Sequence, residues 1–233
     1  MKPIIFCVVG KTGAGKDTIT DILISKVSYL QRLVYSTTRE RRENEIDGVH
    51  YNFKTESDFI NIRSAGDIVE DRSYDTVNGK VRYFTTKDEL ELVESNKAFI
   101  VSASADQVMS YIAAGYEVYL IDIECDAKYR LKRILKRNCK TNKDVLEACR
   151  RIINEEDEYN KINRLNEDKE YGSKLIYKFD NNVEKFFNES LNPWEKIVTI
   201  NEKNFINSSI EGACQFIRYK VVSRNNQVQI TYI

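Results

Sequence analysis

The feature that most constrains this chain is a glycine-rich loop at residues 10–18. An apolar run over residues 4–9 precedes it and a helical pattern of apolar residues follows it, so the order is strand, glycine loop, helix. Glycines let successive backbone N–H groups converge on phosphate oxygens, and the start of the helix adds partial positive charge. This context favours a P-loop over a chance glycine turn. It predicts an ATP site formed by Gly10, Lys11, Thr12, Gly13, Ala14, Gly15, Lys16, Asp17 and Thr18.

Two positions in this loop predict its chemistry. Lys16 is expected to reach the β- and γ-phosphates. Asp17 follows it where P-loops usually have Ser or Thr, and Thr18 comes next. Carboxylate and hydroxyl oxygens suit Mg²⁺. Either Asp17 helps to hold the metal, directly or through water, or it points away and leaves Thr18 as the ligand. We therefore predict Mg²⁺ as cofactor, with ATP as co-substrate.

Composition narrows the class of protein. The 233 residues suffice for one large domain or a core with small lids. The net charge of +0 gives no global attraction to nucleic acid or to an anionic membrane, so neither is expected as a partner. The five cysteines form no Cys-x-x-Cys pair, which favours a reducing cytoplasm over a disulfide framework or a zinc site. The first apolar run is too short for a signal peptide, and no run approaches the length of a membrane span.

Strand and helix patterns alternate along much of the chain, which predicts a parallel sheet with helices on both faces. Strands are expected at 4–9, 33–35, 98–101, 116–123, 194–200 and 227–233, and a helix at 208–222. Residues 36–92 interrupt this rhythm with a short helix capped by Thr55 or Ser57, a hairpin at Asn78-Gly79 and a capped helix from Thr86 to about 95. A basic helix after Asp126 and a long helix capped by Asn142, to about 165, follow. We predict a core over 1–35 and 93–233, an α+β insertion over 36–92 and a helical lid at about 126–165. No role is assigned to 166–193.

The insertion begins with a segment that resembles guanylate kinases. That family carries Thr-Thr-Arg-x-x-Arg, then an acidic-x-x-Gly stretch, then Tyr-x-Phe, and here the same spacing is filled by residues 37–42, 45–48 and 51–53. The resemblance runs with gaps from residue 4 to about residue 217 and is strong over 4–60. It implies an α/β P-loop kinase fold with a monophosphate-binding insertion and a lid. It also implies transfer of the ATP γ-phosphate to a nucleoside monophosphate, GMP or dGMP, by a monomer or homodimer.

The resemblance implies roles for particular residues. Lys16, Arg39, Arg137 and Arg151 match catalytic positions, with Arg150 as an alternative to Arg151. Arg133 matches a lid arginine over the ATP. Six residues match positions that contact the acceptor: Arg39, Arg42, Tyr51 and Tyr83 at its phosphate, and Glu70 and Thr85 at its base.

Three departures from the family pattern leave the acceptor open. Asp17 replaces Ser or Gly, Ser104 replaces an acidic residue after the strand at 98–101, and Tyr35 replaces a Ser that contacts the base. The first two resemble the ribose-bisphosphate phosphokinase branch, which phosphorylates a sugar phosphate and is the alternative function. A third class, guanylate-kinase-like binding modules without catalysis, lacks the P-loop lysine that is present here as Lys16.

Overall fold

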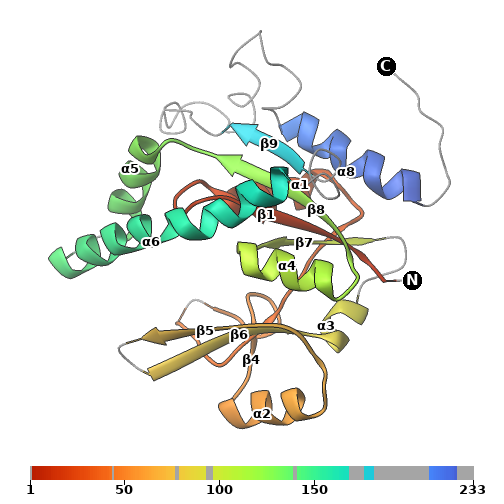
Figure 1. Ribbon diagram of the computed structural model, residues 1–233, viewed down its shortest axis with the longest axis horizontal. Helices are drawn as coiled ribbons and strands as arrows, with labels where there is room; N and C mark the ends of the chain where they lie inside the picture. Colours follow the sequence, from red (N-terminus) through yellow and green to blue (C-terminus); the bar gives the residue numbers. More distant parts are fainter. Residues whose placement is uncertain are drawn as a thin grey trace.

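The computed structural model describes residues 2–43, 45–76, 79–92, 97–138, 141–167, 176–180 and 210–224. Their elements are arranged in two layers around separate sheets (Figure 1). In chain order they are β1 Ile4–Val9, α1 Lys16–Lys26, β2 Leu30–Arg32, β3 Ser36–Thr37, β4 Asn52–Phe53, α2 Glu56–Ser64, β5 Ile68–Thr76, β6 Gly79–Thr86, α3 Lys87–Glu91, β7 Ala98–Ser102, α4 Ala105–Ala113, β8 Glu117–Glu124, α5 Ala127–Asn138, α6 Asn142–Glu167, β9 Ile176–Asp180 and α8 Ile210–Arg224.

The first sheet has the strand order β2-β7-β1-β8-β9, and all its strand pairs are parallel. Strand β1 lies at its centre and buries every one of its six residues. A strand covered on both faces must be apolar throughout, which is why residues 4–9 show no alternation. The predicted α/β fold with a parallel sheet flanked by helices is confirmed.

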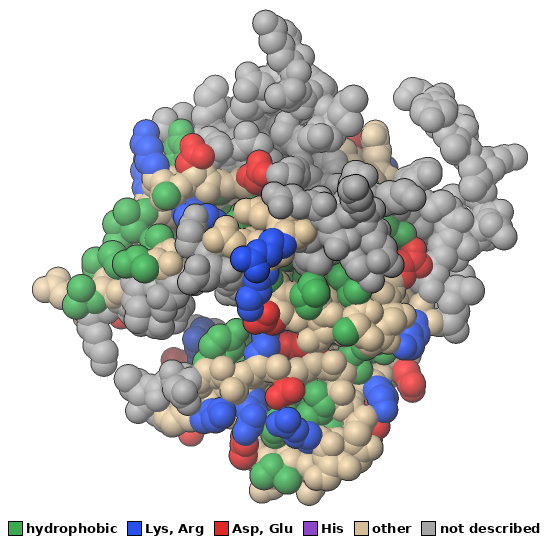
Figure 2. All heavy atoms as spheres, in the orientation of Figure 1, with side chains coloured by type: hydrophobic (Ala, Val, Ile, Leu, Met, Phe, Trp, Pro, Cys, Tyr) green, Lys and Arg blue, Asp and Glu red, His purple; other side chains and the backbone are tan. Residues whose placement is uncertain are grey.

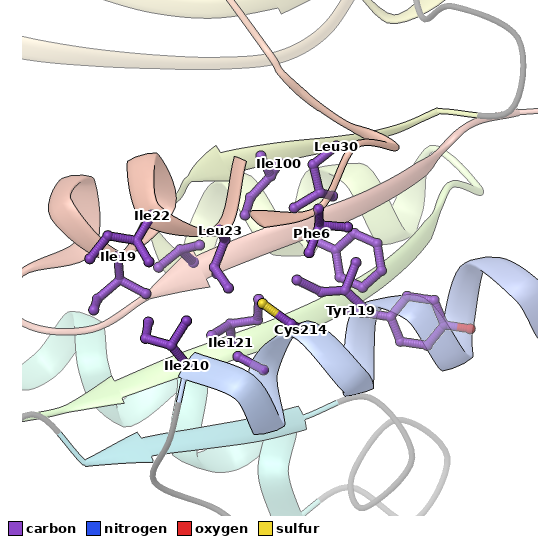
Figure 3. Packing of buried hydrophobic residues seen from close by; sticks show 14 of the residues in the cluster. Phe6, Ile19, Ile22, Leu23, Leu30, Ile100, Tyr119, Ile121, Ile210 and Cys214 are labelled. Carbon is purple, nitrogen blue, oxygen red and sulfur yellow. The ribbon is translucent and has the colours of Figure 1, made fainter. Parts of the chain in front are cut away.

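Successive side chains of β1 point to opposite faces of the sheet and build two separate cores. Ile4, Phe6 and Val8 pack against α1 and α8, and this core is drawn in Figure 3. On the other face, Ile5, Cys7 and Val9 pack with residues of α4. The two cores fix the end of β1, and therefore the glycine loop that follows it.

The second sheet has the order β4-β3-β6-β5 and lies with α2 below the first in Figure 1. The predicted hairpin forms between β5 and β6. It pairs Thr76 with Gly79, whereas a turn centred on Asn78-Gly79 would pair residue 77 with Lys80; residues 77 and 78 are outside the described part of the chain. Both predicted caps form: Thr55 and Thr86 each make a reciprocal capping box with the acidic residue three positions later. These caps set where α2 and α3 begin.

Three details of the sequence prediction are wrong. The strand predicted at 33–35 is absent. The strand that pairs with β7 is β2, which ends at Arg32, and the chain then crosses to the second sheet. Helix α3 ends at Glu91 rather than near 95. Thr141, not Asn142, caps α6, since its Oγ1 accepts from Asp144 N–H at 3.2 Å.

The strands predicted at 194–200 and 227–233 lie outside the described residues. Among the described helices, none is long and apolar enough to cross a membrane.

Candidate active site

The glycine loop joins the end of β1 to the start of α1 and depends on residues without a side chain. Gly10, Gly13 and Gly15 all have positive φ angles. A Cβ atom on Gly10 would lie 2.6 Å from the Ile123 carbonyl oxygen. A Cβ atom on Gly13 would lie 2.8 Å from the carbonyl oxygen of Arg130. The loop is thus held close to β8 and α5, with its backbone N–H groups at the N-terminus of a helix, as an anion site requires.

Lys16 is the first residue of α1 and its side chain folds back over the loop. Its Nζ donates to the carbonyl oxygen of Gly10 at 2.7 Å and to that of Lys11 at 3.4 Å. The ammonium group therefore lies inside the loop that is predicted to cradle the phosphates.

Helices α5 and α6 cover the other side of the loop. Glu155 of α6 accepts a hydrogen bond from the Thr12 backbone N–H at 2.8 Å. Arg130 of α5, which is almost fully buried, donates to the Thr12 carbonyl oxygen at 3.2 Å and pairs with Glu155 at 3.4 Å. Arg133 donates to the carbonyl oxygens of Gly13 and Ala14 at 3.2 and 3.3 Å. The Glu155 carboxylate thus accepts from one of the backbone N–H groups that a P-loop offers to phosphate.

The remaining lid arginines are not placed at the level of side chains. Arg137 lies on α5, and Arg150 and Arg151 lie on α6, but their side chains are outside the described part of the structure. Their predicted role over the ATP stays a prediction.

The predicted metal ligands lie in the first turn of α1. Both Asp17 and Thr18 are exposed to solvent beside the glycine loop. Among the described residues, no cluster of three or more His, Cys, Asp or Glu could hold a metal alone. Mg²⁺ usually takes one or two protein oxygens and completes its shell with water and substrate phosphates.

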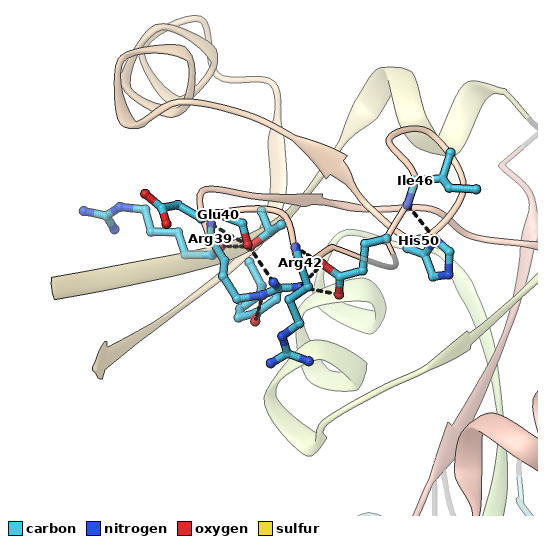
Figure 4. Close-up of polar contacts among 9 residues, drawn as sticks. Arg39, Glu40, Arg42, Ile46 and His50 are labelled. Atoms are coloured by element: carbon cyan, nitrogen blue, oxygen red, sulfur yellow. Dashed lines mark hydrogen bonds and ion pairs between the residues drawn. The ribbon is translucent and has the colours of Figure 1, made fainter. Parts of the chain in front are cut away.

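A second cationic centre lies in the insertion, around Arg39 (Figure 4). Its Nε donates to the Tyr83 hydroxyl at 3.1 Å, and its Nη2 donates to both carboxylate oxygens of Glu45, at 2.7 and 3.0 Å. The hydrogen bond from Arg39 lowers the pKa of Glu45. The Arg39 side chain is only 15% exposed. Two groups predicted at the acceptor phosphate, Arg39 and Tyr83, are therefore in direct contact.

Arg42 and Tyr51 border this centre. The Arg42 backbone N–H donates to Glu45 at 2.9 Å, while its exposed guanidinium points away from the contacts drawn in Figure 4. The ring of Tyr51 lies 5.8 Å from that of Tyr83 and 5.4 Å from Arg39 Cζ. Burial raises the pKa of Tyr51, so its hydroxyl stays protonated and able to donate. Three of the four groups predicted at the acceptor phosphate, those of Arg39, Tyr51 and Tyr83, thus lie together, and the Arg42 guanidinium does not join them.

The residues predicted at the base are buried more deeply. Glu70 and Thr85 are 3% and 0% exposed. Thr85 Oγ1 donates to Glu70 at 3.3 Å and lies 2.8 Å from the Tyr111 hydroxyl. Glu70 also pairs with Arg72 at 2.5 Å, and burial raises the pKa of Glu70 to about 7. Neither Glu70 nor Thr85 faces solvent, and their contact with an acceptor stays a prediction.

A pocket of about 240 Å³ lies between the glycine loop and strand β5, and Figure 2 shows the molecule hollowed between its upper and lower parts. One wall is the glycine loop, including Lys16, and the lid contributes Glu155 and Tyr159. The opposite wall includes Arg72 and Tyr74 of β5, and Ser104 at the start of α4. The pocket is thus bordered by both the nucleotide loop and the insertion.

Three polar residues at this site were not found by sequence reasoning. Arg72, Arg130 and Glu155 lie in charged stretches that are typical of solvated faces, and no pattern separates them from their neighbours. The sequence held one indirect signal for Arg72, which is that Ser104 replaces the family's acidic residue. In the structure, Ser104 Oγ accepts a hydrogen bond from Arg72 Nη1 at 3.3 Å.

Comparison with known proteins agrees with this architecture. The sequence model of the family described as guanylate kinase matches residues 1–169. A guanylate kinase from Oceanobacillus iheyensis is 30% identical over 156 residues, which are 66% of this chain and 74% of that protein. One from Mycoplasmoides gallisepticum is 28% identical over 61% of this chain and 72% of that protein. A match to one from a Chelativorans species, 48% identical, spans only 27% of that protein.

Among solved structures, guanylate kinase from Anaplasma phagocytophilum superposes with a TM-score of 0.51 at 15% identity, covering 97% of this chain and 87% of the other. That likeness supports the fold. Together with the family match over residues 1–169, it leads to one conclusion: the chain belongs to the guanylate kinase family, a family of ATP-dependent nucleoside monophosphate kinases.

Proposed function

We propose that this protein transfers the γ-phosphate of ATP to a nucleoside monophosphate, GMP or dGMP. The observation that carries the proposal is a pocket that has Lys16 on one wall and Arg72 and Tyr74 of the insertion on the other. A phosphoryl transfer needs its two polyphosphate substrates held in line and neutralised, and little else from the protein. A pocket between a P-loop and a cationic insertion meets that need.

The glycine loop and the insertion would each bind one substrate. The backbone N–H groups of residues 10–18 would hold the ATP phosphates, and Lys16 would exchange its carbonyl contacts for phosphate oxygens. In the insertion, Arg39 and Arg42 would bind the acceptor phosphate, because guanidinium groups match its geometry. Tyr51 and Tyr83 would donate their hydroxyls to the same group.

The lid would complete the site when ATP is bound. We propose residues 126–165 as this lid, with α5 and α6 already lying against the glycine loop. Arg133, Arg137 and Arg151 would stabilise the charge on the transferring group. We assign residues 36–92 as the acceptor-binding insertion and residues 1–35 and 93–233 as the core.

Mg²⁺ fits the first turn of α1, where Thr18 and Asp17 would hold it beside the triphosphate. When bound there, Mg²⁺ would neutralise negative charge on the phosphate oxygens. The role of the chain is to offer hard oxygen ligands at the end of the glycine loop.

The test is an assay of ADP release with ATP, Mg²⁺ and a panel of acceptors: GMP, dGMP, AMP, CMP, UMP, dTMP and ribose bisphosphate. We expect turnover with GMP or dGMP. Lys16→Ala should lower kcat/KM by roughly 1000-fold, as the loss of a charge-stabilising group does. Lys26→Ala, at the far end of the same helix, is the matched control and should retain activity.

The other outcomes separate the alternatives. Turnover of ribose bisphosphate alone would select the sugar-phosphate kinase. No turnover with any acceptor would favour a binding module. Unchanged activity of Lys16→Ala would contradict the role of the P-loop.

A further inference from the structure

Arg72 belongs to strand β5 of the insertion, but its guanidinium lies at the edge of the core sheet. Its Nη1 donates to Ser104 Oγ at 3.3 Å. Ser104 follows Ala103, whose backbone N–H donates to the carbonyl oxygen of Val8 at 3.0 Å. Val8 lies two residues before Gly10, where the glycine loop begins. Arg72 therefore lies at the carboxyl ends of the parallel strands, where α/β sheets bind their ligands.

The pocket that Arg72 lines has the charge balance of an anion site. Lys11 and Lys16 of the glycine loop line the same pocket. Of the described residues that border it, Glu155 alone is acidic, and its carboxylate pairs with Arg130 at 3.4 Å. Cationic side chains that converge on a cleft attract negatively charged ligands. The occupant that this balance favours is a phosphate group.

The contacts of Arg72 hold its side chain in place and leave it able to donate. Its Nε lies 2.5 Å from Glu70 Oε1, and its Cζ lies 5.5 Å from the ring centre of Tyr35. Its Nη2 is buried, and no described residue accepts a hydrogen bond from it. A buried donor without an acceptor is costly. The guanidinium would therefore be stabilised by an oxygen acceptor that a ligand brings into the pocket.

Arg72 also connects the two centres that are predicted to bind phosphate. On one side it shares the pocket with Lys16. On the other side its Cζ is 6.0 Å from the ring centre of Tyr83, whose hydroxyl accepts from Arg39 Nε at 3.1 Å. The group that must pass from ATP to an acceptor phosphate is the γ-phosphoryl group. A cation with contacts toward both centres is placed to meet that group during its transfer.

We propose that Arg72 is a further catalytic residue, which donates a hydrogen bond to an oxygen of the γ-phosphoryl group as that group is transferred. The inference rests on the proposed function, but it holds for any acceptor phosphate. An acceptor oxygen forms a bond to the γ-phosphorus, and the bond from that phosphorus to the bridging oxygen breaks, leaving its electron pair on ADP. No proton has to move in this step, so the protein must chiefly neutralise charge, which a guanidinium does well. Glu70 acts as the positioning residue that holds Arg72.

The first test compares two nucleotides that differ in the γ-phosphate. ADP and a non-hydrolysable ATP analogue, with an imido group as the β,γ-bridge, are titrated calorimetrically in the presence of Mg²⁺. Arg72→Ala should weaken binding of the analogue by roughly 10- to 100-fold, as the loss of a hydrogen bond to a charged group does. Binding of ADP should be unchanged, because ADP has no γ-phosphate. Unchanged ADP binding also shows that the glycine loop of the variant is folded.

Two more variants separate contact from folding. Arg72→Lys keeps a positive charge beside the buried Glu70 and should fall between the wild type and Arg72→Ala, since an ammonium cannot donate in a fork. Arg63→Ala is the matched control, because Arg63 pairs with Asp71, whose side chain alternates with that of Arg72 and points to the other face of β5. It should bind both nucleotides as the wild type does.

The second test is kinetic. Arg72→Ala should lower kcat by roughly 1000-fold, the effect of removing an arginine from a transferring phosphoryl group. The KM for the acceptor should be unchanged, and the loss should be the same for every acceptor that the wild type uses.

The remaining outcomes would overturn the inference or the proposed function separately. Equal weakening of ADP and the analogue in Arg72→Ala and Arg72→Lys would show a structural role only and would overturn the inference. A raised acceptor KM with unchanged kcat would place Arg72 at the acceptor, which overturns the inference and leaves the proposed function intact. If the wild type uses no acceptor, the proposed function fails, and the comparison of ADP with the analogue still decides whether Arg72 contacts the γ-phosphate.

Discussion

The glycine loop and the insertion present positive charge in different ways. The glycine loop uses backbone N–H groups, whose direction is set by φ angles at Gly10, Gly13 and Gly15. The insertion uses guanidinium side chains, and each is already held by a carboxylate: Arg39 by Glu45 and Arg72 by Glu70. The loop depends on backbone conformation, and the insertion depends on paired charges brought together from distant positions.

This difference predicts different sensitivities. The glycine loop should fail when a side chain is added to it and should respond little to pH. The insertion should tolerate added methyl groups at its turns and should respond to the protonation of its carboxylates. The following experiments test that contrast.

The largest effect is expected from Gly13→Ala. The new Cβ would lie 2.8 Å from the Arg130 carbonyl oxygen, at a φ of +80° that side chains rarely adopt. Strain of about 1–3 kcal/mol together with a displaced loop should weaken ATP binding by roughly 100-fold or more, measured by titration calorimetry. Gly66→Ala is the control, because its φ is +75° but nothing lies within 4 Å. Equal ATP affinities in the two variants would show that the close approach is unimportant.

The next effect concerns pH and the buried pair of the insertion. Burial raises the pKa of Glu70 to about 7, from about 4.3 in exposed glutamates. The stability contributed by the protonated form is therefore fully present below about pH 4 and is lost as the pH rises through about 7. Between pH 5 and 8, the wild type should lose up to about 3 kcal/mol of unfolding free energy relative to Glu70→Gln, measured by urea denaturation.

The control for this pH effect is Glu56→Gln, which removes a half-exposed carboxylate that pairs with Arg82 in the same insertion. Its unfolding free energy should follow that of the wild type across the pH range. If Glu70→Gln and the wild type showed the same pH dependence, Glu70 would be ionised throughout, and burial would not control its protonation.

The smallest effect returns to the glycine loop. Glu155 accepts from the Thr12 N–H at 2.8 Å and must release it when a phosphate binds. Glu155→Gln removes the negative charge near the triphosphate, so ATP affinity should increase by roughly 3- to 10-fold, or about 1 kcal/mol. Glu211→Gln on α8, where the carboxylate pairs within its own helix, should leave ATP affinity unchanged. Weaker ATP binding in Glu155→Gln would contradict this prediction and would show that the Glu155 carboxylate holds the glycine loop in its ATP-binding conformation.

Sequence patterns predicted the central elements well where the signal was local. The buried strand at residues 4–9, the capping boxes at Thr55 and Thr86 and the presence of the β5–β6 hairpin were confirmed. The strand expected at 33–35 was wrong, because a short apolar run does not show which neighbour it will pair with. The gathering of Arg39 and Tyr83 was expected only through the family resemblance, and the structure places them 3.1 Å apart.

The sequence by itself determined the glycine loop, the alternation of strands and helices, and the arginine segment of the insertion. These follow from short-range geometry, since a P-loop and a capping box are each complete within a few residues. Only the tertiary structure decided that Arg72 covers Glu70 and reaches Ser104, 32 positions away, and that Glu155 meets Thr12 across 143 positions. Such contacts depend on how two sheets and a lid pack together, and that packing sets which polar atoms line the pocket.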